Sequence, residues 1–425
     1  MQRWLKFTKY LPECGVEPIV LTVDEKYASY PQIDKSLCNE IPFDLRVVKT
    51  KTKEVLNFYK HISPSGQLPH TGFANEGKPN FLQKISRFIR GNFFLPDPRK
   101  GWNKYAYKEA CKLIESEQID AVVTTSPPHS TQLIGLKLKR KYPNIKWIAD
   151  LRDPWSDIYF NKDLYQTSLA KAYNKRLERK VLECADEIIT VSGECVRNFK
   201  SKTSKELPIH LIPNGYDEDD FEILSQNQGQ GSRVKGQGIP NHRITISYVG
   251  SLAPQYETDT FVNALKMLPS DIQSKIHLQF VGGTIPSKLQ ETLSLVPCPL
   301  TLIGYVPHAE AIEYMCTSDI LLLLLPNQSE NKGIVTGKLF EYMASGKSVL
   351  AVCFKDGDAA NILNNYEQEG VFAFGEFQKI AEYLTKAVES LTADPQRLIT
   401  PTNRKAAEAY SRRALCRKVA ELIKK

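Results

Sequence analysis

The sequence predicts an α/β protein built from two doubly wound domains, each a parallel sheet covered by helices on both faces. Three observations predict this class. Short apolar, β-branched runs alternate with longer amphipathic runs, which is the pattern of parallel strands joined by helices. A chain of 425 residues is too long for one core and is expected to form about two to three domains. A polar stretch rich in Gly and Gln at 225–243 separates two regions that both show the alternation.

The elements follow in order along the chain. In the first region, apolar runs predict buried strands at 18–23, 121–125, 147–150, 187–191 and 209–213, and amphipathic runs predict helices near 104–117, 129–142 and 165–184. In the second region, the same patterns predict strands at 244–250, 277–283, 300–304, 320–325 and 348–352, with helices near 257–268, 307–316 and 376–391.

These elements set the expected domain boundaries. We place an N-terminal Rossmann-like domain at 1–215, a linker or surface excursion at 216–243, a C-terminal Rossmann-like domain at 244–400 and a closing helix at 401–425 that packs back on the fold. An amphipathic helical pattern precedes the first strand, although a doubly wound domain ordinarily opens with a strand. We therefore expect that the first strand of the N-terminal domain is missing.

Composition narrows the class of protein. The net charge of +8 favours phosphate-bearing or anionic ligands but is too small for a nucleic-acid-binding surface. Nine dispersed cysteines without a CxxC pair or a Cys/His cluster predict reduced thiols and no zinc site. The longest apolar run, Ile320–Leu325, is far shorter than the about 20 residues that span a bilayer. There is no secretory signal pattern, so we expect a cytoplasmic protein.

The segment "TGKLFEYMASGK" places a lysine where a cation is disfavoured. Thr336 is a candidate N-cap, Gly337 leaves the backbone open to a ligand, and Lys338 falls in the first turn, at the positive end of the helix. One interpretation is a phosphate site, with Glu341 one turn later accepting bonds from vicinal hydroxyls. The alternative is a Lys338–Glu341 pair on a solvated helix face.

Two segments of the first region place polar residues at the carboxyl ends of predicted strands, where open α/β sheets bind ligands. "DLRDPW" contains Asp150, Arg152 and Asp153, which could form a structural ion-pair cluster instead of a ligand site. "TTSPPHS" places His129 at a helix start, which favours a neutral imidazole. This histidine is either a local hydrogen-bonding cap or a contact to a sugar hydroxyl.

Residues 81–102 form a basic amphipathic segment. It carries Lys or Arg at positions 84, 87, 90, 99 and 100, one acidic residue, Asp97, and an apolar stripe of Phe81, Leu82, Ile85, Phe88 and Ile89. Such a segment is suited to lying on an anionic membrane. The alternative is a helix whose stripe packs on the domain core.

Several segments, in this order, resemble glycosyltransferase family 4, in a bacterial branch used for surface polysaccharides: "TSPPHS", "ADLRDPW", "IPNGYD", "YVGSL", "GYVPHAEAIEYM" and "TGKLFEYMASGK". The resemblance covers nearly the whole chain. It implies the GT-B fold, two Rossmann-like domains facing a cleft, with the acceptor on the N-terminal side and a nucleotide-sugar donor held mainly by the C-terminal domain. It also implies transfer with retention of the anomeric configuration and gives no protein nucleophile.

The resemblance also assigns residues by position. Glu341 matches the second glutamate of the family's Glu-x7-Glu motif, which binds the ribose hydroxyls. Thr336, Gly337 and Lys338 match the helix start that holds the diphosphate. Gly250 and Ser251 match the first C-domain loop, and Tyr305 and Val306 match the loop that contacts the nucleobase. His129 corresponds to the histidine near the donor sugar and Asp153 to a cleft-facing acid, and these two are the candidate catalytic residues.

Two positions depart from the family pattern. Gly333 stands where the first glutamate of the motif would be, so the usual contact to donor-sugar hydroxyls is missing. After the first C-domain strand, Ser251 and Tyr256 occupy the positions where many members carry Arg and Lys, which leaves Lys338 or Lys332 as the diphosphate-binding cation.

The sequence therefore predicts sugar transfer from a nucleotide diphosphate sugar to a glycan or lipid-linked acceptor in polysaccharide biosynthesis. The chemistry needs stabilisation of the departing diphosphate, which a helix N-terminus and a lysine provide without a metal or other cofactor. The expected location is the cytoplasm, with peripheral contact at the inner face of the plasma membrane, and no nucleic acid is expected as a partner. The alternatives are a catalytically decayed GT-B scaffold protein, impaired by the missing strand, and a nucleotide-sugar epimerase.

Overall fold

The computed structural model describes most of the chain, namely residues 2–29, 36–53, 81–221, 243–252, 255–283, 285–328, 331–393, 401 and 403–424. The chain divides into two compact units, the first formed by Met1–Pro213 with Cys416–Lys425 and the second by Asn214–Leu415. Most of the polar excursion predicted at 216–243 lies outside the described residues.

The first unit contains two parallel sheets. A four-stranded sheet has the order β3 (Ala121–Ser126), β4 (Lys146–Leu151), β5 (Glu187–Thr190) and β6 (Ile209–Leu211), and a two-stranded sheet pairs β1 (Ile19–Val23) with β2 (Arg46–Thr50). The helices are α1 (Gln2–Tyr10), α3 (Phe81–Phe93), α4 (Asn103–Ser116), α5 (Gln132–Lys141), α6 (Ser168–Cys184) and α7 (Gly193–Lys200). Short 3-10 turns include η4 (Pro98–Trp102), η5 (His129–Thr131) and η6 (Tyr159–Leu164).

The second unit contains a six-stranded parallel sheet. Its spatial order is β12 (Val371–Phe372), β11 (Ser348–Val352), β10 (Ile320–Leu324), β7 (Ile244–Val249), β8 (Ile276–Val281) and β9 (Leu300–Ile303). The helices are α9 (Asp259–Met267), α10 (Ser270–Gln273), α11 (Ser287–Ser294), α12 (His308–Thr317), α13 (Gly337–Ala344), α14 (Asp358–Leu363) and α15 (Phe377–Ala393). The turn η8 (Arg404–Tyr410) leads to the closing helix α16 (Arg412–Lys424).

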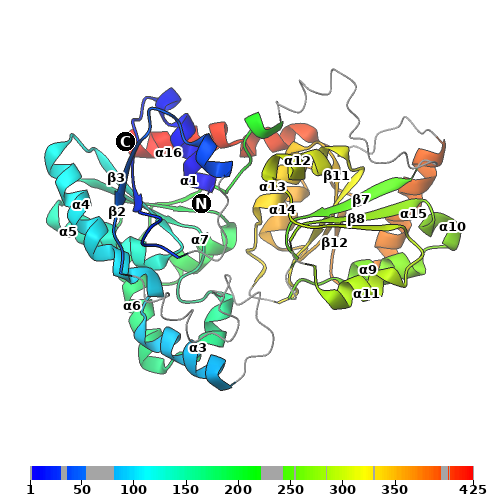
Figure 1. Cartoon of the computed structure of the whole chain (residues 1–425), viewed down its shortest axis with the longest axis horizontal. Coiled ribbons are helices and arrows are strands. Elements are labelled where there is room, and N and C mark those ends of the chain that lie inside the picture. The colour runs from blue at the N-terminus through cyan, green and yellow to red at the C-terminus, as the bar shows by residue number, and fades with distance from the viewer. Residues whose placement is uncertain are drawn as a thin grey trace. The chain divides into compact units, whose positions relative to one another are not determined.

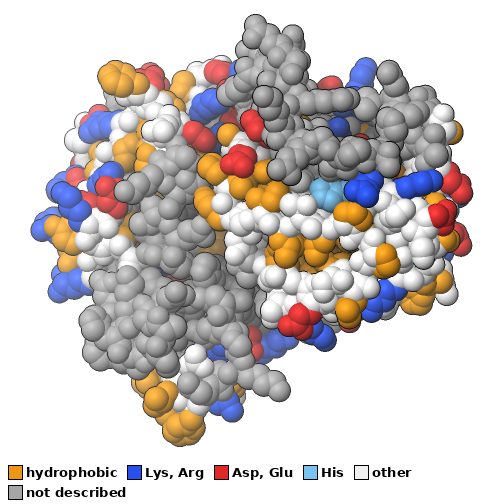
Figure 2. Space-filling view, turned by 45° about the vertical axis from the view of Figure 1, so that its right-hand side comes forward, with side chains coloured by type: hydrophobic (Ala, Val, Ile, Leu, Met, Phe, Trp, Pro, Cys, Tyr) orange, Lys and Arg blue, Asp and Glu red, His pale blue; other side chains and the backbone are white. Residues whose placement is uncertain are grey.

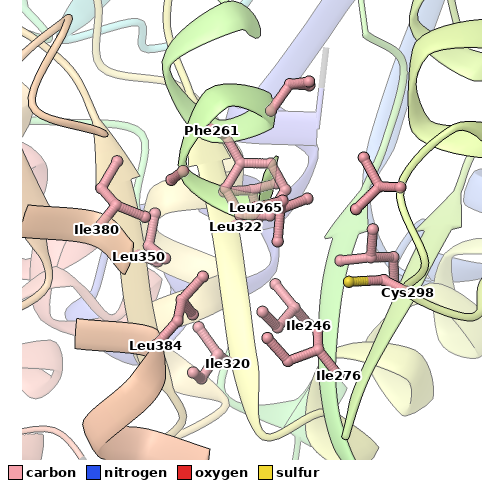
Figure 3. Close-up of a cluster of buried hydrophobic side chains, with 14 of the residues drawn as sticks. Ile246, Phe261, Leu265, Ile276, Cys298, Ile320, Leu322, Leu350, Ile380 and Leu384 are labelled. Atoms are coloured by element: carbon pink, nitrogen blue, oxygen red, sulfur yellow. The ribbon is translucent and has the colours of Figure 1, made fainter. Parts of the chain in front are cut away.

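The core of the second unit shows why its strands are apolar without interruption. Ile320, Leu322 and Leu324 of β10 pack with α9, α11 and α15, whereas Leu321 and Leu323 pack with α12, α13 and α14. Alternate side chains point to opposite faces of a strand, and helices cover both faces of this sheet (Figure 1). Figure 3 shows the first of these clusters, in which Phe261 and Leu265 of α9 lie beside Leu322.

The α/β class and its parallel sheets are confirmed. Each strand predicted from an apolar run is present with similar bounds. Strand β2 and the two-residue strand β12 were not predicted from the sequence, and both lie at sheet edges. Among the described residues, no helix is both long and apolar enough to cross a membrane.

Candidate functional site

The candidate site of the second unit lies where its sheet changes winding direction. From β7 the chain continues to β8 and β9 on one side, and then crosses to β10 and β11 on the other side of β7. The connections that leave β7 and β10 therefore turn away from each other at the carboxyl ends of these strands. This topological switch point is the place where open α/β sheets bind ligands. The loop after β7 and the segment before α13 both begin here.

Lys338 reaches from the first turn of α13 to the end of β7. Its Nζ lies 2.5 Å from Tyr248 Oη and 3.4 Å from the carbonyl oxygen of Ser251, and 4.2 Å from the centre of the Tyr248 ring. In the described structure, Lys338 forms no ion pair with Glu341, so the surface-pair alternative is wrong. Burial lowers the pKa of Lys338 to about 8, although the nearby Glu341 charge favours the protonated form.

Gly250 leaves room for the lysine stem. A Cβ on Gly250 would lie 2.9 Å from Lys338 Nζ and 3.1 Å from its Cδ, so a larger residue would push the lysine side chain aside. The backbone of Gly250 also has a φ of +121°, which a residue with a Cβ rarely adopts. Gly250 is therefore required for Lys338 to lie over the end of β7. The predicted neighbour Ser251 contributes its backbone carbonyl, and its side chain is exposed.

Two tyrosines hold α13 against the end of β7, and neither was predicted from the sequence as part of the site. Tyr342 Oη accepts a hydrogen bond from Val249 N at 2.9 Å and lies 3.3 Å from Val249 O, to which it donates. Tyr248 Oη donates to the Ser251 carbonyl at 3.0 Å. Burial raises the pKa of both phenols, which therefore stay neutral hydrogen-bonding groups. In the sequence, both read as ordinary core aromatics.

The N-terminus of α13 is open. Thr336 adopts the extended conformation of an N-cap, but its hydroxyl makes no capping bond, and Oγ1 is buried without a hydrogen-bond partner among the described residues. Gly337 is exposed, and a Cβ placed on it would meet no atom within 4 Å. The first N–H groups of a helix have no partner within it. Together with Lys338, this helix start offers several unsatisfied donors to an anion.

Glu341 and Lys332 differ in what they contact. In the described part of the chain, the Glu341 carboxylate has no hydrogen bond or ion pair with protein. Lys332, the other candidate cation, instead lies 2.5 Å from Asp356 Oδ2 in an exposed ion pair. Lys338 is thus the cation at the switch point, and Glu341 is a carboxylate one turn away without a protein partner.

Tyr305 and Val306 follow β9 at the same edge of the sheet. Tyr305 is 58% exposed, and its Cβ lies 3.8 Å from where a Cβ on Gly283, after β8, would be. Strands β7, β8 and β9 are consecutive neighbours in the sheet. The structure therefore brings Gly250, Ser251, Tyr305, Val306, Thr336, Gly337, Lys338 and Glu341 to the carboxyl edge of one sheet.

In the first unit, His129 follows β3 and stacks on Trp155. The two ring centroids are 5.2 Å apart and the rings are tilted by 9°. Neither ring nitrogen has a hydrogen-bond partner among the described residues, and Nδ1 is buried. His129 therefore does not act as a hydrogen-bonding cap. Burial lowers the pKa of His129 to about 3, and the charges of Lys202 and Arg152 act in the same direction, so the imidazole is neutral.

Three side chains that the sequence analysis did not assign hold the surroundings of His129. Asp97 accepts hydrogen bonds from Ser130 N at 2.7 Å and Ser130 Oγ at 2.8 Å, which fixes the peptide after His129. Asn103 donates to the Ser130 carbonyl at 2.7 Å. The fully buried Glu178 accepts from Trp155 N at 3.2 Å and from Lys202 Nζ at 2.7 Å, which holds the stacking indole. All three are distant from His129 in the sequence.

The ion-pair cluster of Asp150, Arg152 and Asp153, which was the alternative to a ligand site, does not form. Arg152 Nε instead donates to the carbonyl of Ser126, the last residue of β3, at 3.1 Å. Asp150 accepts bonds from Trp4 and Thr125 and lies 3.6 Å from Arg3 Nε. Asp153 has no hydrogen bond or ion pair in the described structure. Burial raises its pKa, and the Asp150 charge adds to this effect while Arg152 opposes it.

The described residues contain no group of three or more His, Cys, Asp or Glu side chains arranged to hold a metal ion.

Comparisons with known proteins agree with this architecture. The family model described as Glycosyltransferase Family 4 matches residues 69–220, and that described as Glycosyl transferases group 1 matches residues 232–405. An uncharacterized glycosyltransferase of Methanocaldococcus jannaschii is 23% identical over 199 residues, 46% of this chain and 47% of that protein. A putative teichuronic acid biosynthesis glycosyltransferase of Bacillus subtilis is 23% identical over 204 residues, 48% of this chain and 49% of that protein.

The chain thus spans about half the length of the curated relatives it matches. Among solved structures, the Anabaena protein HepE in complex with UDP and glucose superposes with a TM-score of 0.57 at 13% identity. That match covers 100% of this chain and 95% of the Anabaena chain. At this identity, the likeness concerns the fold.

Proposed function

We propose that this chain, a family 4-like glycosyltransferase of the GT-B fold, transfers a sugar from a nucleotide diphosphate sugar to a glycan or lipid-linked acceptor in polysaccharide biosynthesis. The observation that carries the proposal is the pairing of Lys338 with the open start of α13 at the switch point of the second sheet. The Bacillus relative is named for teichuronic acid biosynthesis, and the Anabaena structure contains UDP and glucose.

The donor's charged centre is assigned to the start of α13. The diphosphate accepts hydrogen bonds from the first N–H groups of the helix, and Lys338 Nζ leaves Tyr248 to pair with it. Glu341, without a protein partner, accepts bonds from the ribose hydroxyls. The exposed ring of Tyr305 and the backbone at Val306 line the nucleobase.

The same groups serve the reaction itself. As the bond between the sugar and the diphosphate breaks, negative charge builds up on the leaving phosphate. Donors already fixed at that position stabilise the charge more in the transition state than in the ground state. Lys338 and the α13 N–H groups supply this stabilisation, and we propose that no metal ion is needed.

The first unit supplies the groups assigned to the sugar and the acceptor. His129 stays neutral because of its low pKa and offers a ring nitrogen to a sugar hydroxyl. Asp153 has no protein partner in the described structure and is assigned as the acid beside it. Transfer with retention is proposed from the family resemblance, and the acceptor is placed at the cytoplasmic face of the membrane.

Gly333 is the observation that favours the non-catalytic alternative. It removes a carboxylate that family members use on the donor sugar, whereas the described structure keeps Lys338, Glu341 and the open helix start in place. A decayed scaffold protein would bind UDP without turning over any nucleotide sugar. Release of UDP from a panel of nucleotide sugars, with membrane extract as the acceptor source, distinguishes the two functions.

Glu341→Gln is expected to weaken UDP binding about tenfold. The substitution removes the charge of an acceptor that bonds the ribose, and hydrogen bonds to charged groups contribute about 1.5–3 kcal/mol. Isothermal titration calorimetry with UDP measures the change. The matched control is Glu291→Gln on the exposed side of α11, which should leave the affinity unchanged. Equal affinities for the Glu341 variant and the unmodified protein would remove Glu341 from the site.

Affinity for a UDP-sugar is expected to fall as the pH rises through about 8. Lys338 has a pKa of about 8 in the free protein, and a bound diphosphate favours its protonated form. Binding therefore takes up a proton above this pH, and affinity decreases by up to about tenfold per pH unit. The diphosphate diester of a nucleotide sugar has no proton to lose in this range. Calorimetry in buffers of different ionisation enthalpy counts the proton taken up, and an affinity independent of pH between about 7 and 9 would contradict the assignment.

A further inference from the structure

Helix α3 turns its apolar stripe away from the protein. Its large hydrophobic residues are between 41% and 75% exposed, whereas its buried residues are Arg87 and Gly91. At about 3.6 residues per turn, Arg87 and Gly91 fall on the side opposite the stripe. The exposed set is Phe81, Leu82, Ile85, Phe88, Ile89 and Phe93. A surface helix of a globular domain normally shows the reverse arrangement, so the alternative that this stripe packs on the core is wrong.

The buried side of α3 packs closely on η6 and the segment after it. A Cβ on Gly91 would lie 2.4 Å from the Leu164 carbonyl oxygen, so only glycine permits this approach. Asn92 donates to the Tyr165 carbonyl at 3.2 Å and accepts from Thr167 N at 2.8 Å. These contacts fix α3 beside the start of α6, with its apolar side outward.

The start of α6 extends the same surface. Leu169 is 84% exposed, and Tyr165 and Tyr173 are also exposed. The exposed basic residue Lys84 of α3 lies one turn before Phe88, beside the apolar stripe, and α3 contains no acidic residue. We define the α3–α6 surface as the six apolar residues of α3 together with Lys84, Tyr165, Leu169 and Tyr173. Figure 2 shows hydrophobic side chains gathered at the lower end of the first unit, where α3 lies in Figure 1.

We propose that the α3–α6 surface docks the protein on an anionic lipid bilayer. Apolar and aromatic side chains suit the boundary between acyl chains and headgroups. Lys84 beside them, on a helix without acidic residues, adds attraction to an anionic membrane surface. A second copy of this chain is the less favourable occupant, because pairing two such surfaces would bring their lysines together without acidic partners. This proposal rests on the proposed function, because it states that the enzyme binds a lipid-linked acceptor at the bilayer surface. The vesicle-binding test itself does not require a nucleotide-sugar donor.

The test uses the full chain with vesicles of phosphatidylcholine, with or without phosphatidylglycerol. We expect co-sedimentation with the anionic vesicles and at least tenfold weaker binding to the neutral ones. Leu82→Glu combined with Phe88→Glu should reduce binding to anionic vesicles more than tenfold, because both side chains are exposed and the changes leave the core intact. The matched control is Met267→Glu combined with Leu295→Glu, exposed apolar residues of the second unit, which should bind like the unmodified chain.

Further measurements distinguish membrane docking from the proposed function and from dimerisation. Lys84→Gln should weaken anionic binding about fivefold, because one lysine near an anionic surface contributes about 1 kcal/mol, while leaving UDP affinity and thermal unfolding unchanged. Vesicle binding without UDP binding would overturn the proposed function but would still support the docking surface. No binding by the unmodified chain, or equal binding by the Leu82/Phe88 variant, would overturn the surface. A dimer in light scattering that this variant abolishes would overturn the membrane in favour of a second copy.

Discussion

Replacing Lys338 with alanine is expected to lower kcat/KM for the nucleotide-sugar donor about 10²- to 10³-fold, the loss typical for removing one fixed group that stabilises transition-state charge. Lys338 is the cation at the switch point of the second sheet, and Lys332 is held by Asp356. The alanine variant also loses the contact to Tyr248, so its thermal unfolding is measured beside its activity. The rate is followed as UDP release.

Lys332→Ala is the control for this substitution. It removes the same charge a few residues earlier in the chain. It breaks an exposed ion pair with Asp356 and a contact of Nζ with the Phe354 ring at 5.7 Å, which both contribute little to stability at an exposed site. Its kcat/KM should stay within about twofold of the unmodified enzyme. If the two variants lose activity equally, or if Lys338→Ala keeps full activity, Lys338 does not contact the diphosphate.

Replacing Asp150 with alanine is expected to lower the free energy of unfolding of the first unit by about 3–5 kcal/mol, the cost of removing one partner of a buried ion pair. The carboxylate is fully buried at the end of β4. It accepts hydrogen bonds from Trp4 Nε1 at 2.6 Å and Thr125 Oγ1 at 2.8 Å, and its Oδ2 lies 3.6 Å from the buried Arg3. The variant leaves the Trp4 indole and the Thr125 hydroxyl without this acceptor and removes the carboxylate beside Arg3, which keeps its hydrogen bonds to the carbonyls of Ile212 and Pro213.

Tryptophan fluorescence during urea unfolding measures this change selectively. The tryptophans of the chain are Trp4, Trp102, Trp147 and Trp155, and all four lie in the first unit. Glu194→Ala, which breaks an exposed pair with Arg197, is the control and should change the free energy of unfolding by less than about 1 kcal/mol. A loss of similar size for both variants would show that Asp150 is not a buried anchor of this unit.

The sequence predicts the strands well because both faces of these sheets are covered, so a strand is a continuous apolar run. The run at 320–325 is an example, since its side chains enter two separate clusters. Strand β2 was missed for the opposite reason. It lies at a sheet edge and is only half-buried, and its residues Arg46 and Lys49 are exposed, so its sequence lacks that signal.

The candidate site was predicted in part. The helix start at Thr336 and the cation at Lys338 are local patterns, and both are visible in one short segment. The residues that contact them could not be predicted in this way. Tyr248, which contacts Lys338, lies 90 residues earlier in the sequence and has the pattern of an ordinary core aromatic. Glu178 likewise holds Trp155 from a helix whose sequence reads as charged and solvated. The sequence also did not determine which face of α3 is buried. Helical periodicity separates an apolar face from a polar face but does not say which of the two packs on the protein.

The most direct test of the donor site is a crystal structure of this chain with UDP bound. We expect the diphosphate at the N-terminus of α13, within hydrogen-bond distance of the N–H groups of Gly337 and Lys338. Lys338 Nζ should move from Tyr248 to the phosphate, and Glu341 should bond the ribose. UDP bound at another edge of the sheet, with Lys338 still on Tyr248, would contradict the account.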